Sequence, residues 1–187
     1  MPGLLSNIDP NGLLEYSVVY TDRSLNHMSQ SFQGVMNDVS TSLKSVYNAQ
    51  AVIVVPGGGT YAMEAVARQF ATNQNCLVLR NGWFSFRWSQ IFEMGNIPSE
   101  ETVMKARRVS KGLQAPFTPA DIHEVVDMIK MKKPNLVFAP HVETASGIIL
   151  PDEYIRSVAD AVPQLAECLY WIVLLQVLSG LTWKIVV

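Results

Sequence analysis

The chain has 187 residues, of which 49% are hydrophobic and 16% are charged, and its formal net charge at pH 7 is −2. Such a composition is typical of a globular protein, and without a block of Lys and Arg it argues against nucleic-acid binding. Cys76 and Cys168 belong to no CxxC or Cys/His pattern, so neither a disulfide framework nor a metal site is predicted. Because the first residues lack a signal-peptide pattern, we expect a cytoplasmic protein.

Apolar periodicity predicts the elements in chain order. Helical spacing of the apolar residues predicts a helix at 28–49, and an apolar run predicts a strand at 51–55. After a glycine run, a second set of helically spaced apolar residues predicts a helix that ends at Phe70. The later elements are expected as a strand at 76–79, a helix at 83–94, a strand at 102–106, a helix at 119–131, a strand at 135–139 and a helix at 151–162. Thr118 is the expected N-cap of the helix at 119–131, with Pro119 at its first position. Alternating strands and helices predict an α/β domain with a parallel sheet.

Ligands of such sheets bind at the carboxyl ends of the strands, where three loops are notable. They are PGGGT at 56–60, RNGWFSFRW at 80–88 and PHVETASG at 140–147. The first loop places unobstructed backbone N–H groups at a helix N-terminus, with the Thr60 hydroxyl at the N-cap, which suits an anion such as phosphate. The same glycines would equally serve a tight strand-to-helix turn.

The glycine loop also matches the dinucleotide pattern G-x-G-x-x-A through Gly57, Gly59 and Ala62. The acidic residue that this pattern expects after the next strand is replaced by Arg80 and Asn81. A P-loop is excluded, because no Lys-Ser/Thr pair follows the glycines.

The other two loops carry aromatic and polar side chains. Aromatic residues at the start of a helix more often belong to the core than to a ligand platform, but Phe84 follows a strand exit and is the ring we expect over a flat ligand. His141 alone would be a structural histidine. Because His141 stands with Glu143, Thr144 and Ser146 at a strand exit, the group favours a functional role for this loop.

Together, the motifs GGGTYAMEA, NGWFSFRW and APHVETASGIILP resemble the class V aminotransferases, in particular the alanine–glyoxylate and serine–pyruvate branch. The resemblance covers nearly all of residues 10–162. It implies fold type I, pyridoxal 5′-phosphate as cofactor and a homodimer. It also implies transfer of an amino group from a small amino acid, such as alanine or serine, to a 2-oxo acid such as glyoxylate or pyruvate.

The resemblance also implies the cofactor contacts. Gly58, Gly59 and Thr60 would contact the phosphate of the cofactor. Phe84 would stack on the pyridine ring, and Thr144 and Ser146 would line that ring. Many family members carry Ser where this chain has Gly58, so here the backbone must serve in place of one side-chain contact.

The resemblance ends after Val162. The family continues into an Asp that pairs with the pyridine nitrogen and later into the lysine that holds the cofactor. In this chain Lys184 is the single lysine of residues 163–187, and it does not match the family's lysine. In the neighbouring reading frame, the codons of Tyr170, Trp171 and Ile172 must encode Leu-Asp, because tryptophan has one codon and isoleucine codons begin with AT. We therefore predict an out-of-frame tail at 163–187.

The expected organisation is an N-terminal arm at 1–27, a partial, truncated large domain at 28–162 and this tail. No catalytic residue is expected in the chain, because the lysine is absent, and the chain as written is expected to be inactive. Two other classes remain open: an NAD(P)-binding oxidoreductase domain that uses the glycine turn, and a non-catalytic module tethered to a membrane by residues 169–187. That segment is at the short end for a span of about 20 residues, so membrane attachment is not favoured. The same segment could also form a buried strand and helix.

Overall fold

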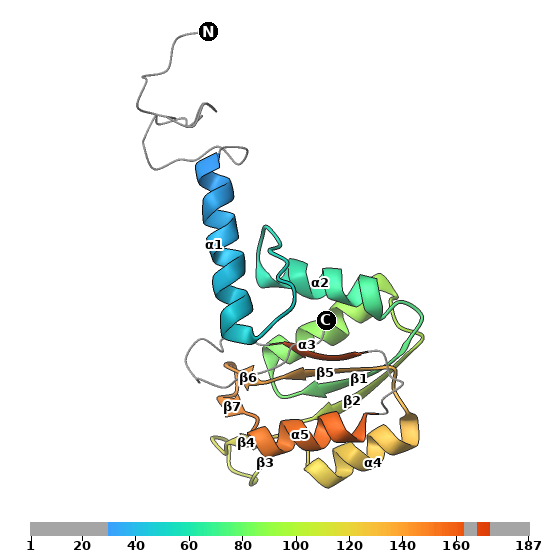
Figure 1. The fold of residues 1–187 in the computed structure, drawn as a ribbon. Coiled ribbons are helices and arrows are strands. Elements are labelled where there is room, and N and C mark those ends of the chain that lie inside the picture. Colours follow the sequence, from blue (N-terminus) through green and yellow to red (C-terminus); the bar gives the residue numbers. More distant parts are fainter. Residues whose placement is uncertain (1–29, 163–167, 173–187) are drawn as a thin grey trace. The chain divides into compact units, whose positions relative to one another are not determined.

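The computed structural model describes residues 30–162 and 168–172 (Figure 1). The chain divides into two compact units, whose described parts are residues 30–53 and residues 54–162 with 168–172. The expected arm at 1–27 and most of the expected tail at 163–187 lie outside the described residues.

The first unit contains helix α1 (Gln30–Tyr47), which confirms the helix predicted at 28–49. None of its residues is buried, and Val35, Val39 and Val46 are exposed. The strand predicted at 51–55 is wrong, because these residues have no strand conformation and the side chain of Ile53 is 81% exposed. A strand is stabilised by hydrogen bonds to a neighbour, and none of the described strands pairs with this segment.

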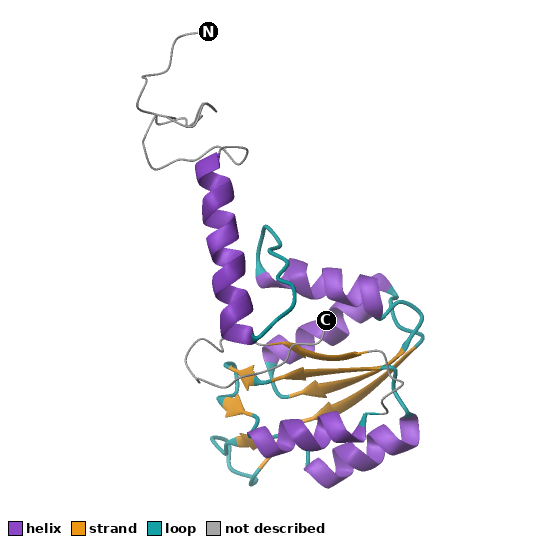
Figure 2. Ribbon diagram, viewed as in Figure 1, coloured by secondary structure: helices purple, strands orange, loops and turns teal. Residues whose placement is uncertain are grey.

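The second unit is built on a four-stranded parallel sheet in the order β2-β1-β5-β8. Its strands are β1 (Asn75–Arg80), β2 (Glu100–Lys105), β5 (Leu136–Pro140) and β8 (Cys168–Ile172). Parallel neighbours require crossover connections, and helices supply them, as Figure 2 shows. The parallel α/β sheet predicted from the sequence is confirmed.

Helices cover both faces of this sheet (Figure 1). One face carries α2 (Gly59–Phe70) and α3 (Trp83–Gly95), and the other carries α4 (Ile122–Lys132) and α5 (Asp152–Ala161). Two short antiparallel pairs join β3 (Arg107–Arg108) to β4 (Phe117–Thr118) and β6 (Val142–Glu143) to β7 (Ile148–Ile149).

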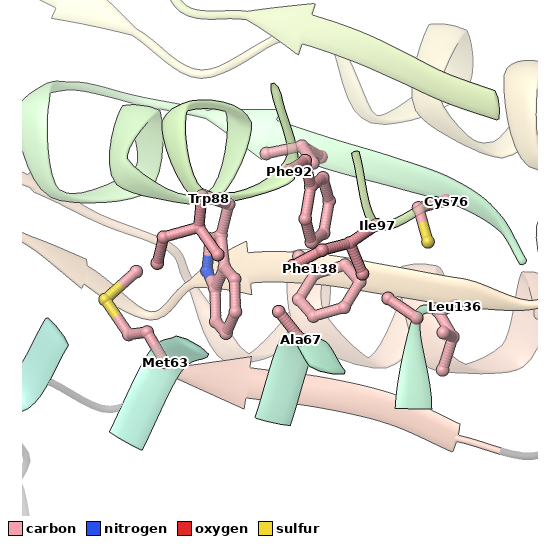
Figure 3. Close-up of a cluster of buried hydrophobic side chains, with 11 residues drawn as sticks. Met63, Ala67, Cys76, Trp88, Phe92, Ile97, Leu136 and Phe138 are labelled. Carbon is pink, nitrogen blue, oxygen red and sulfur yellow. The ribbon is translucent and has the colours of Figure 1, made fainter. Parts of the chain in front are cut away.

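The core has two halves because successive residues of a strand point to opposite faces. Cys76 and Val78 of β1 pack with α2 and α3, whereas Leu77 and Leu79 pack with α4 and α5. Figure 3 shows the first half, in which Trp88, Phe92 and Phe138 meet with ring centroids 4.5 to 6.1 Å apart; these three side chains are the largest fully buried ones described.

Helix α4 begins later than the sequence predicts. Its N-cap is Asp121, whose carboxylate accepts a hydrogen bond of 2.8 Å from the backbone N–H of His123. The prediction that Thr118 caps the helix is wrong, because Thr118 pairs with Arg107 in the β3-β4 ladder. An Asp at the N-cap also gains from the positive end of the helix dipole, which a Thr hydroxyl does not.

Candidate functional site

The carboxyl ends of β1 and β5 are joined by a buried carboxylate. Glu143, which is 0% exposed, reaches from β6 to the first turn of α3. Its Oε1 accepts a hydrogen bond of 3.2 Å from the Phe84 N–H, and its Oε2 accepts bonds of 2.9 and 2.7 Å from the N–H and hydroxyl of Ser85. A carboxylate at this place satisfies free N–H groups and the positive end of the helix dipole.

This contact explains a glycine that the sequence alone leaves ambiguous. A Cβ built on Gly82 would lie 2.7 Å from Cγ of Glu143, so a side chain there would displace the carboxylate. Ser85 closes the same turn, because its hydroxyl accepts hydrogen bonds of 2.8 and 3.0 Å from the N–H groups of Asn81 and Gly82. The sequence indicates Glu143 as part of a polar loop but does not reveal its contact with α3, because 58 residues separate Glu143 from Ser85.

The aromatic residues of the second loop divide between core and surface. Trp88 is buried against Phe138, as the usual role of such rings predicts. Phe84 is 38% exposed, and Glu143 holds its backbone. An exposed ring on a fixed backbone at a strand exit is suited to contact a flat ligand.

The glycine turn precedes α2. Gly57 has a φ of +128°, and a Cβ there would collide with the Tyr61 ring, so this position requires glycine. Gly58 is the N-cap and Gly59 the first helical residue; a Cβ on either would meet no atom within 4 Å. A serine would therefore fit at Gly58.

Thr60 lies inside the first turn of α2, so its expected place at the N-cap is wrong. A glycine can take the N-cap because the carbonyl of Gly58 already accepts a 2.9 Å bond from the Tyr61 N–H without any side chain. The Thr60 hydroxyl instead accepts a hydrogen bond of 3.4 Å from Nη1 of Arg87 in α3. A cation thus stands beside the positive end of a helix, an arrangement that favours an anion between them.

The third loop combines a buried imidazole with an unsatisfied hydroxyl. Burial lowers the pKa of His141 below its ordinary 6.5, and the Asp152 carboxylate partly opposes that shift. The Ser146 Oγ is buried and has no hydrogen-bond partner, whereas Thr144 is exposed. A ligand with a polar group could satisfy this hydroxyl.

Contacts therefore link the first loop to the second and the second loop to the third. Arg87 joins the start of α2 to α3, and Glu143 joins α3 to the hairpin of β6 and β7. Within the described residues, no hydrogen bond or ion pair connects the glycine turn directly to Thr144 or Ser146. The same residues contain no group of three or more His, Cys, Asp or Glu side chains that could hold a metal ion. No helix among them has the length and apolarity that crossing a membrane requires.

Comparison with known proteins shows which proteins the chain is similar to. No family model matches the chain. Over 149 residues, 78% of the chain and 33% of the relative, it is 26% identical to the alanine–glyoxylate aminotransferase of Rattus norvegicus. The chain fits the N-terminal part of a class V aminotransferase. It spans about a third of the length of that curated relative.

Solved class V structures share its fold. Pyridoxamine–pyruvate aminotransferase from Mesorhizobium loti superposes with a TM-score of 0.61 at 16% identity, over 88% of this chain and 40% of that one. Ureidoglycine–glyoxylate aminotransferase from Bacillus subtilis gives 0.58 at 18% identity, over 73% and 34%. Alanine–glyoxylate aminotransferase from Nostoc gives 0.53 at 20% identity, over 72% and 35%. The expected fold type I is confirmed, as a part of the whole fold.

Proposed function

We propose that this domain belongs to a pyridoxal 5′-phosphate-dependent aminotransferase and binds the phosphate of that cofactor at the start of α2. The observation that carries the proposal is the open space at Gly58 and Gly59, where a built Cβ meets no atom within 4 Å, next to the Arg87 guanidinium. Free N–H groups, a helix dipole and a cation at one point are suited to a phosphate dianion. The Thr60 hydroxyl is a further donor there.

The ring of the cofactor would lie against Phe84. Glu143 holds the backbone of Phe84 from the side of β6, so the exposed ring offers a fixed apolar surface that limits tilting of a flat ligand. Thr144 and Ser146 would line the ring, and the unsatisfied Ser146 hydroxyl is a group that such a ligand would satisfy. When bound, pyridoxal phosphate supplies the electron sink that allows an amino acid to lose its α-proton.

For the whole protein we propose transfer of an amino group from a small amino acid, such as alanine or serine, to a 2-oxo acid such as glyoxylate or pyruvate. A cytoplasmic homodimer is part of the same proposal. These assignments follow the relatives, whose names specify aminotransfer to glyoxylate or pyruvate. The 187-residue chain by itself is proposed not to transaminate, since the family lysine and its partner Asp follow the region that matches.

Binding is tested with 4-deoxypyridoxine 5′-phosphate, which has the phosphate and ring of the cofactor but no aldehyde to react with surface lysines. Calorimetric titration should detect binding to the full chain. Gly58→Asp should weaken it about tenfold by repulsion of the phosphate, although Asp is a better N-cap than Gly and should not lower the melting temperature. Gly58→Ser is the matched control and should bind at least as tightly as the original chain.

Two outcomes would contradict the proposal. Equal affinity of the Asp and Ser variants would show that the phosphate binds elsewhere, and stabilisation by NADP without any by the pyridoxine phosphate would favour a dinucleotide site. The inactivity of the isolated chain is tested separately with alanine, glyoxylate and pyridoxal phosphate. Measurable formation of pyruvate and glycine by the purified chain would refute it.

A further inference from the structure

A cavity opens at the carboxyl ends of β1 and β2. It has a volume of about 330 Å³, and its wall includes Arg80, Asn81, Trp83, Phe86, Lys105 and Phe117. Neither the glycine turn nor Phe84 lines it, so it is separate from the proposed cofactor site. Its size is at the lower end of small-molecule sites, which span about 300–1,000 Å³.

Two cationic residues line this cavity. Arg80 and Lys105 occupy the same register position of the neighbouring strands β1 and β2. Like charges directly opposite each other on adjacent strands are destabilising. In the part of the chain that the structure describes, neither side chain forms an ion pair, and no carboxylate lines the cavity. An anion in the cavity would find both cations in its wall.

The rest of the wall is aromatic. The rings of Trp83 and Phe86 meet edge to face with centroids 5.9 Å apart, and Phe117 of β4 adds a third, exposed ring. The Arg80 guanidinium carbon lies 4.7 Å from the centroid of Phe86, which holds the cation against the aromatic wall. Flat apolar groups pack well against such rings, whereas a bare inorganic anion would leave them in water.

One buried donor in the wall lacks an acceptor. Asn81 is 4% exposed, and its side-chain amide nitrogen is buried without a hydrogen-bond partner. Because a buried polar group without a partner is costly, an oxygen atom of a ligand would stabilise this part of the turn. Asn81, the two cationic residues and the three aromatic residues all line one cavity.

We propose that this cavity binds a small organic anion with a flat apolar body, of the class of aromatic carboxylates. The carboxylate lies between Arg80 and Lys105, and the ring lies against Trp83, Phe86 and Phe117. The site does not depend on the proposed function, because it shares no lining residue with the proposed cofactor contacts.

The experiment uses benzoate as the probe and the full chain labelled with ¹⁵N. Benzoate should shift the indole N–H resonance of Trp83, assigned with Trp83→Phe, and should bind more tightly than neutral benzamide or ringless acetate. Lys105→Gln should weaken benzoate binding about tenfold, because a charge-assisted contact is lost. Lys130→Gln, an exposed lysine of α4 that does not line the cavity, is the matched control and should leave the affinity unchanged.

Other variants separate this proposal from the cofactor site. Gly58→Asp should leave benzoate binding intact, and Lys105→Gln should leave the melting temperature and the binding of 4-deoxypyridoxine 5′-phosphate intact. Equal binding of benzoate and benzamide, an unchanged affinity in Lys105→Gln, or the absence of any shift of Trp83 at millimolar benzoate would each overturn the proposal.

Discussion

Removal of the Glu143 carboxylate should be among the most damaging single changes in this domain. Glu143→Ala deletes a fully buried side chain that accepts three hydrogen bonds from the first turn of α3. The N–H groups of Phe84 and Ser85 lose their acceptor, and each stranded buried donor costs about 1–3 kcal/mol. With the lost interaction of the charge with the helix dipole, we expect a decrease of about 3–4 kcal/mol in the free energy of unfolding.

Glu143→Gln should cost less, about 1–2 kcal/mol, because its amide oxygen can still accept from a backbone N–H. Both values are a substantial fraction of the total stability of a domain, which is about 5–15 kcal/mol. The ring of Phe84 loses its fixed backbone in the same variants, so the affinity for 4-deoxypyridoxine 5′-phosphate should fall in the same order.

The assay is urea unfolding followed by far-ultraviolet circular dichroism, which measures the midpoint and slope for each variant. Glu93→Ala is the matched control, because Glu93 is exposed on the same helix and its replacement should change stability by no more than about 0.5 kcal/mol. The reasoning would be refuted if Glu143→Ala unfolded at the same urea concentration as Glu93→Ala.

Three further changes test other parts of the structure. Gly82→Ala should cost about 1–3 kcal/mol in urea unfolding, since its Cβ would lie 2.7 Å from Glu143 Cγ; an unchanged midpoint would contradict this contact. Because burial lowers the pKa of His141, the unfolded chain binds a proton first, and stability should fall as the pH drops below about 6.5. His141→Gln should reduce this pH dependence of the melting temperature, and an identical pH profile would argue against it. In Cys168→Ser, Cys76 should react with a thiol reagent only after unfolding, because burial raises its pKa to about 12; rapid reaction of the native protein would disprove its burial.

The elements that the sequence predicted well are those whose pattern reports burial directly. The runs of apolar residues in β1 and β5 identify strands covered on both sides, and the helical spacing between them predicts the crossover helices. The apolar run at 51–55 also predicts a strand, and that prediction is wrong, because this segment pairs with no described strand. An apolar run records what a segment could bury, not whether a partner is present.

The candidate site likewise has features that the local sequence predicts and contacts that only the tertiary structure shows. The glycines, the exposed aromatic residue and the polar loop at strand exits were recognisable because each has a local chemical signature, and the order of the motifs pointed to the class V aminotransferases. The link between Glu143 and α3, and the placing of Arg80 beside Lys105, depend on strands and loops that are distant in the chain. The sequence by itself thus determined the type of most elements and the resemblance to a family, since both follow from local pattern. Only the tertiary structure decided which charge caps which helix and which cations share a cavity, because these contacts exist only after the sheet has brought separate segments together.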